Sequence, residues 1–415
     1  TMKLRNKVIA AVSIVGMLSG LAACGSASGA TGQTTISYFS TWNGSMIKPV
    51  IEEFEKDNPN IKVDVSFAAN PAQYAQTLRT RISGNQTPDV FMLASEIRDQ
   101  MIDSGYTLDV TNEPFVKNLS DSNREYLTRK GKVYGASIGA WSNAMAYNPD
   151  LLAKVGYSEF PTTWDDFMTM LEKLKDAGIA PYVTPVDQTP HEFQAMLGAH
   201  YAATGDKAGE RKVFDGKSTF EKEYTPYLTK WNDLFDKGLV SRDMVGANGD
   251  DLFAMFTAGK VAVYKSGTWD LDRLKQSGVK FGLAPNPSVN GEGQYLSGNA
   301  SQGIAIAATA KGAKLEAAKK LLTFLTSEKG LALLEKNTAT VITAKNYKTD
   351  VIPEYKDLYD NYLMKGKYYL SVNNWPRGTD VLQAEMYAQV QRMVQGEITP
   401  AEVGKAMDEK LATVG

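Results

Sequence analysis

Between residues 34 and 105 the chain alternates between two spacings of apolar side chains. In segments such as 61–67 every second residue is apolar, which predicts a half-buried β-strand. In segments such as 73–82 the apolar residues lie four positions apart, which predicts an amphipathic helix. The predicted strands are 34–39, 61–67 and 88–93, and the predicted helices are 46–56, 73–82 and a segment from 97 to about 105. This order predicts an α/β fold with a mainly parallel sheet and helices on both faces.

Two polar segments, 41–44 and 94–96, follow the first and third predicted strands. The carboxyl ends of parallel strands meet at one edge of a sheet, and ligands bind there in α/β proteins. We therefore expect both segments on one rim of a binding site.

A second region of the chain opens near Ala146. Thr163 is a predicted helix N-cap, with Asp166 three residues later, and helix-rich sequence continues from there to Phe256. The later predicted elements are strands at 261–264 and 303–308, a long helix at 317–334, an amphipathic helix at 381–394, and a last helix opened by a Thr399–Glu402 capping box with Pro400 in its first turn.

The N-terminal segment has the features of an export signal. Residues 1–23 carry three early basic residues, then a run from Val8 that is uncharged and too short to span a bilayer comfortably. The run ends in Leu-Ala-Ala-Cys-Gly, which resembles a bacterial lipobox with Cys24 as the acylated residue. We expect residues 1–23 to be removed, and residues 24–33 to form a flexible tether to the lipid bilayer. The alternative is that Cys24 is only a small apolar residue in a hydrophobic segment.

Composition narrows the possible chemistry. The 415 residues make two domains the expectation, since one core rarely serves so long a chain. With 45 basic and 47 acidic residues, the net charge of −2 predicts no nucleic-acid partner. A single cysteine excludes an intramolecular disulfide, and with two histidines it leaves too few ligands for a structural zinc site. No metal or cofactor is predicted.

Enzyme motifs are missing from the sequence. Neither a Gly-x-Ser-x-Gly elbow, a His-Glu-x-x-His helix nor a Gly-x-Gly-x-x-Gly loop is present. Glycoside hydrolysis needs two positioned carboxylates, and no motif singles out a pair among the acidic residues. We therefore predict no catalytic residue.

Several segments, in this order along the chain, resemble the family 1 extracellular solute-binding proteins of bacterial ABC importers, in their oligosaccharide-binding branch. They are FEKDNPNIKV (54–63), TPDV (87–90), AYNPDLLAKVG (146–156), PTTWDDF (161–167), FTAGKVAV (256–263) and AAKKLLTFL (317–325). Together with the lipobox they cover nearly the whole chain after residue 23.

The resemblance implies a two-lobe, periplasmic-binding-protein-like fold with a hinge and a ligand cleft between the lobes. By analogy, lobe one takes 34–143 and 302–344, and lobe two takes 144–301 and 345–415. The implied function is to capture oligosaccharides by closure of the lobes and to deliver them to the membrane permease. The protein would act as a monomer, lipid-anchored at the extracellular face of the cell membrane. Alternatives are a binding protein for a peptide or polyol, or a glycan-active surface enzyme.

A sugar site needs aromatic rings for the flat C–H faces of the sugar and polar groups for its hydroxyls. Two tryptophans lie on amphipathic helices and are expected in the core: Trp164 and Trp231. Four lie in polar or glycine-rich loops and are candidates for stacking on a sugar, although each can instead be a packed lid: Trp42, Trp141, Trp269 and Trp375.

The polar candidates beside these rings are Asn43, Asp89, Ser95, Glu96, Asp270, Asn299, Ser301 and Arg377. Three of them have structural alternatives. Asp89 follows a proline and can cap a turn, and Glu96 can serve as a carboxylate at a helix N-terminus. Arg377 can form a forked contact to sugar hydroxyls or pair with Asp380. His191, at a helix start, can reach the cleft, but this position more often places histidine at the surface.

Overall fold

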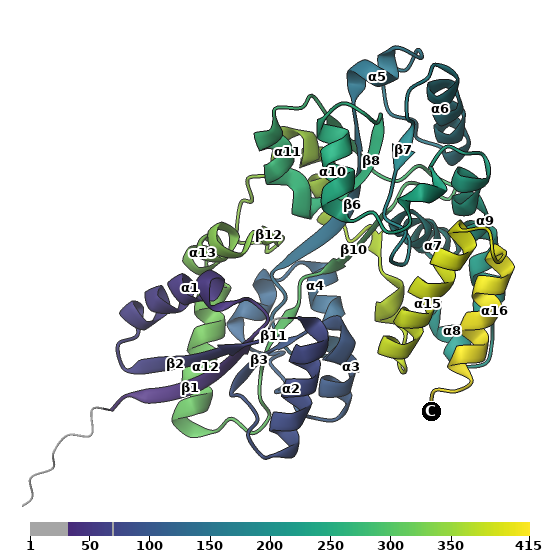
Figure 1. Ribbon diagram of the computed structural model, residues 1–415. Helices are drawn as coiled ribbons and strands as arrows, with labels where there is room; N and C mark the ends of the chain where they lie inside the picture. Colours follow the sequence, from purple (N-terminus) through teal and green to yellow (C-terminus); the bar gives the residue numbers. More distant parts are fainter. Residues whose placement is uncertain (1–31, 69) are drawn as a thin grey trace, which may run out of the picture.

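The computed structural model describes residues 32–68 and 70–415, and these form two lobes (Figure 1). The expected signal peptide 1–23, the lipidation residue Cys24 and the expected tether up to residue 31 lie outside the described residues. Within the described part of the chain, each helix is too short or too polar to cross a bilayer.

The first lobe is built on a four-stranded sheet. Its strands, in the order in which they pair, are β11 (Gly303–Ile306), β3 (Val90–Leu93), β1 (Thr34–Ser40) and β2 (Ile61–Phe67). β1 is parallel to both of its neighbours, whereas β11 is antiparallel to β3. The predicted parallel pairing of the first three strands is therefore confirmed, and a strand from far along the chain closes one edge.

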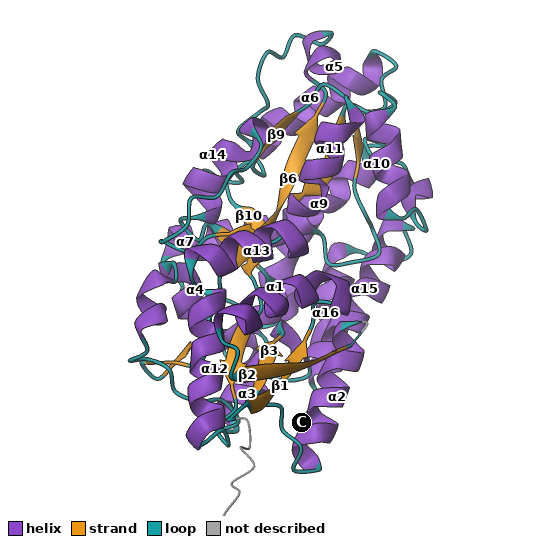
Figure 2. Cartoon of the chain, turned by 90° about the vertical axis from the view of Figure 1, so that its left-hand side faces the viewer, coloured by secondary structure: helices purple, strands orange, loops and turns teal. Residues whose placement is uncertain are grey.

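Helices cover both faces of this sheet (Figure 2). They are α1 (Gly44–Asp57), α2 (Pro71–Ser83), α3 (Ser95–Asp103) and α12 (Gly312–Leu325), with α13 (Glu328–Thr338) packed against α1 and the short α4 (Asp121–Tyr126) nearby. α1 begins where Asn43 accepts the N–H of Met46, and α2 where Asn70 accepts that of Gln73. Each cap satisfies a donor that the helix itself leaves unpaired.

The single long helix predicted over 317–334 is wrong, because the structure has two helices there. α12 ends near Thr326, whose hydroxyl donates to the Leu322 carbonyl at 2.7 Å. Ser327 then caps α13 by accepting the N–H of Gly330. A Cβ at Gly330 would lie 1.9 Å from the Phe324 carbonyl oxygen, so the turn is tight enough to require glycine. Both helices bury an apolar face, so apolar side chains recur at helical spacing across the whole segment and the sequence pattern does not reveal the turn between them.

The second lobe is built on a seven-stranded mixed sheet centred on β6 (Gly139–Tyr147). β6 is antiparallel to each strand that it pairs with, and it runs from one lobe into the other (Figure 1). The other strands are β7 (Tyr182–Val183), β8 (Val263–Gly267), β9 (Gly282–Ala284), β10 (Leu296–Ala300), β12 (Val341–Ile342) and β13 (Tyr368–Tyr369).

The second lobe is rich in helices, and those whose starts were predicted begin close to the predicted positions. They are α5 (Pro149–Ala153), α6 (Trp164–Asp176), α7 (His191–Thr204), α8 (Arg211–Phe214), α9 (Phe220–Asp236), α10 (Gly249–Thr257), α11 (Leu271–Ser277), α15 (Thr379–Val394) and α16 (Pro400–Leu411). Thr163 caps α6 by accepting the N–H of Asp166, and Thr399 and Glu402 form the predicted capping box of α16. Trp164 and Trp231 are buried among apolar side chains, as predicted.

Apolar packing separates the two lobes. One core holds side chains from residues 36–138 and 304–344, and two others hold side chains from residues 140–296 and 355–407. The chain passes from the core of the first lobe to the cores of the second at the start of β6, a few residues before the boundary at 143 that the resemblance implies. The reason is that the whole of β6 belongs to the second sheet. Lobe one and lobe two are named below on this basis.

Candidate functional site

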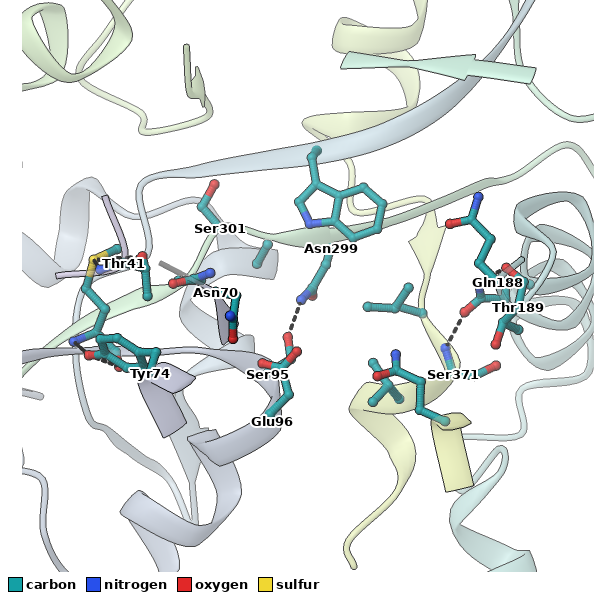
Figure 3. Close-up of a pocket in the computed structure, with 18 of the residues that line it drawn as sticks. Thr41, Asn70, Tyr74, Ser95, Glu96, Gln188, Thr189, Asn299, Ser301 and Ser371 are labelled. Atoms are coloured by element: carbon teal, nitrogen blue, oxygen red, sulfur yellow. Dashed lines mark hydrogen bonds between the residues drawn. The ribbon is translucent and has the colours of Figure 1, made fainter. Parts of the chain in front are cut away.

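A cavity of about 510 Å³ lies between the lobes. Figure 3 shows Tyr74, Ser95 and Glu96 of lobe one on one side, and Gln188 and Ser371 of lobe two opposite them. Thr41 and Trp42, after β1, line the cavity together with Ser95 and Glu96 at the start of α3. The two polar segments expected on one rim therefore both reach this cavity.

Lobe two contributes most of the amide side chains, on elements that sit far apart in the sequence. The amides that line the cavity are Asn70, Gln188, Gln194, Asn299, Gln302 and Gln383. Among the residues that line this first cavity, Glu96 and His191 are the ones that titrate near neutral or acidic pH. The lining is polar but carries little charge.

The helix α3 joins the two lobes beside the cavity. Ser95 Oγ accepts a hydrogen bond of 3.0 Å from Asn299 Nδ2, which lies on β10 of lobe two. One turn later, an Arg98 guanidinium nitrogen donates to the main-chain oxygen of Asn373 at 3.1 Å. Arg98 is almost fully buried, with its guanidinium over the ring of Tyr126 at 4.3 Å. The start of α3 is thus held against lobe two by hydrogen bonds to two different segments.

Two further contacts extend this junction. Asn299 Oδ1 accepts from Asn373 Nδ2 at 2.6 Å, so the Asn299 amide is fixed from both sides. Arg211 of lobe two approaches Asp99 of α3 at 3.7 Å. Asp99 is also paired with Arg98 on the same helix.

Glu96 has an altered ionisation equilibrium. Burial in the cleft raises the pKa of its carboxyl, and the nearby charge of Asp380 raises it further. A carboxyl with a raised pKa is more easily protonated, so it can donate as well as accept a hydrogen bond.

The aromatic candidates occupy different environments. Trp42 and Trp141 line the first cavity and are partly exposed, which leaves ring surface for a ligand. Trp375 also borders this cavity but is only 3% exposed. Its indole N–H donates to the buried Glu210 at 3.2 Å, and its ring packs edge-on against Phe220. Trp375 therefore belongs mainly to the core of lobe two.

A second, larger cavity of about 960 Å³ adjoins the first. The residues that line both cavities are Trp141, Gln188, His191, Ser301 and Thr340. Trp269 lines only the second cavity and is 47% exposed, an unusual exposure for so large an apolar side chain. Its ring centroid lies 6.2 Å from that of Trp141 and 5.7 Å from that of His191.

Two titratable groups beside these rings were not assigned to the site from the sequence. His191, expected at the surface, is only 8% exposed and lines both cavities. Burial lowers the pKa of its imidazole, and the charge of Lys265 lowers it further. Lys265 lines the second cavity and is 3% exposed, and burial lowers its pKa to about 8. The available signal for Lys265 was its place directly after the predicted strand 261–264, which β8 extends to Gly267.

Four predicted ligand-binding residues line neither cavity: Asn43, Asp89, Asp270 and Arg377. Asn43 is the exposed cap of α1. Asp89 precedes β3, so it lies at the amino end of the strand, away from the carboxyl rim. Its carboxylate accepts the N–H of Ser37 at 2.9 Å.

The other two are engaged within lobe two. Asp270 is fully buried and accepts hydrogen bonds of 2.7 Å from the hydroxyls of Tyr264 and Ser266. Arg377 is exposed, with its guanidinium 5.4 Å from the centre of the Phe214 ring. These contacts give all four residues structural partners outside the cleft.

Known proteins resemble this chain over most of its length. Residues 39–332 match the model of the bacterial extracellular solute-binding protein family. A multiple sugar-binding protein of Streptococcus mutans is 24% identical over 363 residues, which cover 83% of this chain and 84% of that protein. A melibiose/raffinose/stachyose-binding protein of Bacillus subtilis is 24% identical over 347 residues, 80% of this chain and 79% of that protein.

A solved structure extends the likeness to the fold. A family 1 extracellular solute-binding protein from Bifidobacterium longum subsp. infantis matches with a TM-score of 0.84 at 37% identity, covering 92% of this chain and 100% of that one. These relatives are binding proteins, and the two-lobe fold with a polar cleft is what such a protein requires. The chain therefore belongs to the bacterial extracellular solute-binding protein family.

Proposed function

We propose that this protein captures oligosaccharides between its lobes and delivers them to the permease of an ABC importer. The observation that carries the proposal is the lining of the first cavity, where partly exposed tryptophan rings stand among uncharged amides. Sugars present flat C–H faces, which pack on aromatic rings, and hydroxyls, which need both donors and acceptors. An amide side chain supplies both from one group.

Charge favours a sugar over a peptide. A short peptide brings a charged amine and carboxylate, and burying such groups without partners is unfavourable. Glu96 is the one carboxyl that lines the first cavity, and its raised pKa makes it a poor partner for an amine. A neutral, hydroxyl-rich ligand matches the lining better.

Binding without turnover is part of the proposal. Glycoside hydrolysis uses a pair of carboxyl groups on either side of the scissile bond. With Glu96 as the only carboxyl that lines it, the first cavity offers no such pair. The relatives named above are likewise binding proteins.

The proposal includes the place of action. A lipid on Cys24, followed by a short tether, would hold a monomer at the extracellular face of the cell membrane. Two acyl chains give stable attachment where one does not.

A ligand screen tests the proposal. Ligands that bind only the folded state raise the melting temperature by mass action. We expect neutral oligosaccharides, tested beside linear polyols and short peptides of similar mass, to raise it in wild type but much less in Trp141→Ala. Stabilisation by the peptides and by none of the sugars would reject the proposed ligand class.

A further inference from the structure

The second cavity is lined by an amine that has no acceptor in the described part of the chain. Lys265 is 3% exposed, and among the described residues its ammonium group has no hydrogen-bond acceptor and no ion-pair partner. Its Nζ lies 5.0 Å from the centroid of the Trp269 indole ring. Nζ is not among the fully buried polar atoms, so it faces the cavity and its three N–H donors are available to a ligand there.

The nearest carboxylates do not use these donors. Glu192 accepts from Thr184 at 2.7 Å and from Trp231 at 3.2 Å, within lobe two. Asp270 is held by its own hydroxyl partners and by Arg273 at 2.5 Å. The charges of Glu192 and Asp270 ease the burial of Lys265 but leave its N–H groups free.

His191 adds a second unused polar atom. Its Nδ1 is buried and has no hydrogen-bond partner among the described residues. The imidazole packs edge-on against Trp269 and at a tilt against Trp141. Because its pKa is lowered, the ring is neutral at pH 7 and can donate one N–H. A lysine ammonium group that faces the cavity and a buried imidazole nitrogen without a partner among the described residues thus flank the exposed indole of Trp269.

We propose that the second cavity is a subsite for one acidic sugar unit, whose carboxylate accepts hydrogen bonds from Lys265 and His191 while its ring packs on Trp269. A carboxylate supplies hydrogen-bond acceptors and a charge opposite to that of the Lys265 ammonium. A hydroxyl can accept a hydrogen bond but carries no charge. The inference rests on the proposed function, because the remainder of the ligand would occupy the first cavity.

The acidic residues that line the second cavity limit the number of carboxylate groups that a ligand can carry. Asp187, Asp272, Glu335 and Asp350 also line it, and the three aspartates are exposed. Arg273 lines it too but is already paired with Asp250 and Asp270. Asp187 acts on Lys265 through its charge, and a chain with a carboxylate on every unit would meet all four carboxyl groups. The favoured ligand therefore carries a single acidic unit joined to neutral ones.

The test compares matched neutral and acidic sugars by titration calorimetry at pH 7. The pairs are lactose with 3′-sialyllactose, and xylotetraose with a xylotriose that carries one glucuronic acid. Tetragalacturonate serves as the polyanion. We expect wild type to bind the acidic member of at least one pair ten times more tightly than its neutral partner, and to bind tetragalacturonate no more tightly than a neutral sugar.

Lysine variants assign the effect to its source. Lys265→Met keeps an unbranched side chain and should abolish the preference for acidic over neutral sugars. Lys265→Arg should retain it. Lys280→Met removes an exposed lysine paired with Asp150 and should behave as wild type.

Each outcome decides the question. Equal binding of acid and neutral sugars, or a preference that survives in Lys265→Met, would overturn the inference and leave the proposed function standing. If Lys265→Met does not fold, the wild-type comparison alone decides. If neutral and acidic sugars all fail to bind, the proposed function falls and the inference with it.

Discussion

Single residues show that exposure, more than loop position, separates candidate ligand contacts from core. Trp269 and Trp375 lie in similar polar loop sequences, yet one is 47% exposed and the other 3%. The difference arises from the partners of Trp375, above all Glu210, which is distant in sequence. A local sequence pattern carries no information about such a partner.

The tryptophans give the first prediction. Trp269→Ala and Trp141→Ala should each weaken binding of the identified sugar by about 2–4 kcal/mol, the range of strong contacts at binding sites. Trp375→Ala should instead lower the free energy of unfolding by about 3–5 kcal/mol, as Trp231→Ala should, because both remove buried rings. One calorimetric titration and one melt per variant separate the two effects. Unchanged affinity in both Trp269→Ala and Trp141→Ala would contradict this assignment.

Lys265 gives a prediction about pH. Its pKa is about 8 in the folded protein and 10.5 unfolded, so the unfolded chain binds more protons between these values. Stability should therefore rise with pH across this window. The charges that act on Lys265 are those of Glu192, Asp270 and Asp187. Burial lowers the pKa of His191, so its imidazole is neutral throughout this window.

The measurement is the difference in unfolding free energy between wild type and Lys265→Met. At pH 7 the variant should gain about 3 kcal/mol from losing the buried charge, and this gain should shrink towards pH 10.5. The same tyrosines titrate in both proteins, so their contribution cancels in the difference between the two unfolding free energies. A difference that does not change between pH 7 and 10.5 would show that Lys265 is not buried as an amine.

At the scale of elements, the turn between α12 and α13 depends on one glycine. Gly330→Ala would place a methyl group against the Phe324 carbonyl, and relief requires the two helices to move apart. We expect a loss of about 3 kcal/mol in urea unfolding, at the upper end for overpacking. Gly84→Ala, whose added Cβ would meet its neighbours at 3.4 Å, should change stability by less than about 0.5 kcal/mol. Equal effects of the two substitutions would be inconsistent with a strained turn.

Elements whose signals are local were predictable from the sequence. The sequences of β1 to β3 either alternate between apolar and polar residues or are continuously apolar, and capping residues mark the starts of α6 and α16. The very short β7, β9, β12 and β13 have no such signal, because pairing with a remote strand creates them. The same distinction applies to the site. Loop tryptophans and the segments after β1 and β3 could be found, whereas His191 and Lys265 reach the cavities only through the packing of lobe two.

At the scale of the whole molecule, α3 bridges the lobes by non-covalent contacts, and the buried Arg98 makes one of them, to the main-chain oxygen of Asn373. Arg98→Met removes the hydrogen bond to Asn373 but keeps much of the apolar stem. The lobes of the empty protein should then separate more often, which raises the radius of gyration in small-angle X-ray scattering. Affinity should fall as well, since less of the protein is in the state competent to close.

A matched variant controls for loss of charge. Arg79→Met removes an arginine that donates to Gln100 on α3 and that, among the described residues, has no hydrogen bond or ion pair with lobe two. Its scattering curve and affinity should equal those of wild type. If Arg98→Met also leaves the radius of gyration unchanged, the contacts made by α3 do not govern the separation of the lobes.

The contacts by which α3 bridges the lobes also have a consequence for transport across the membrane. The hydrogen bonds made by Ser95 and Arg98 join protein groups directly, so they would hold the lobes at the same spacing with or without a sugar in the cleft. A permease that recognises this spacing would be occupied by empty copies as well as loaded ones. Excess binding protein would then slow import at low sugar concentration, and weakening the bridge would relieve that inhibition.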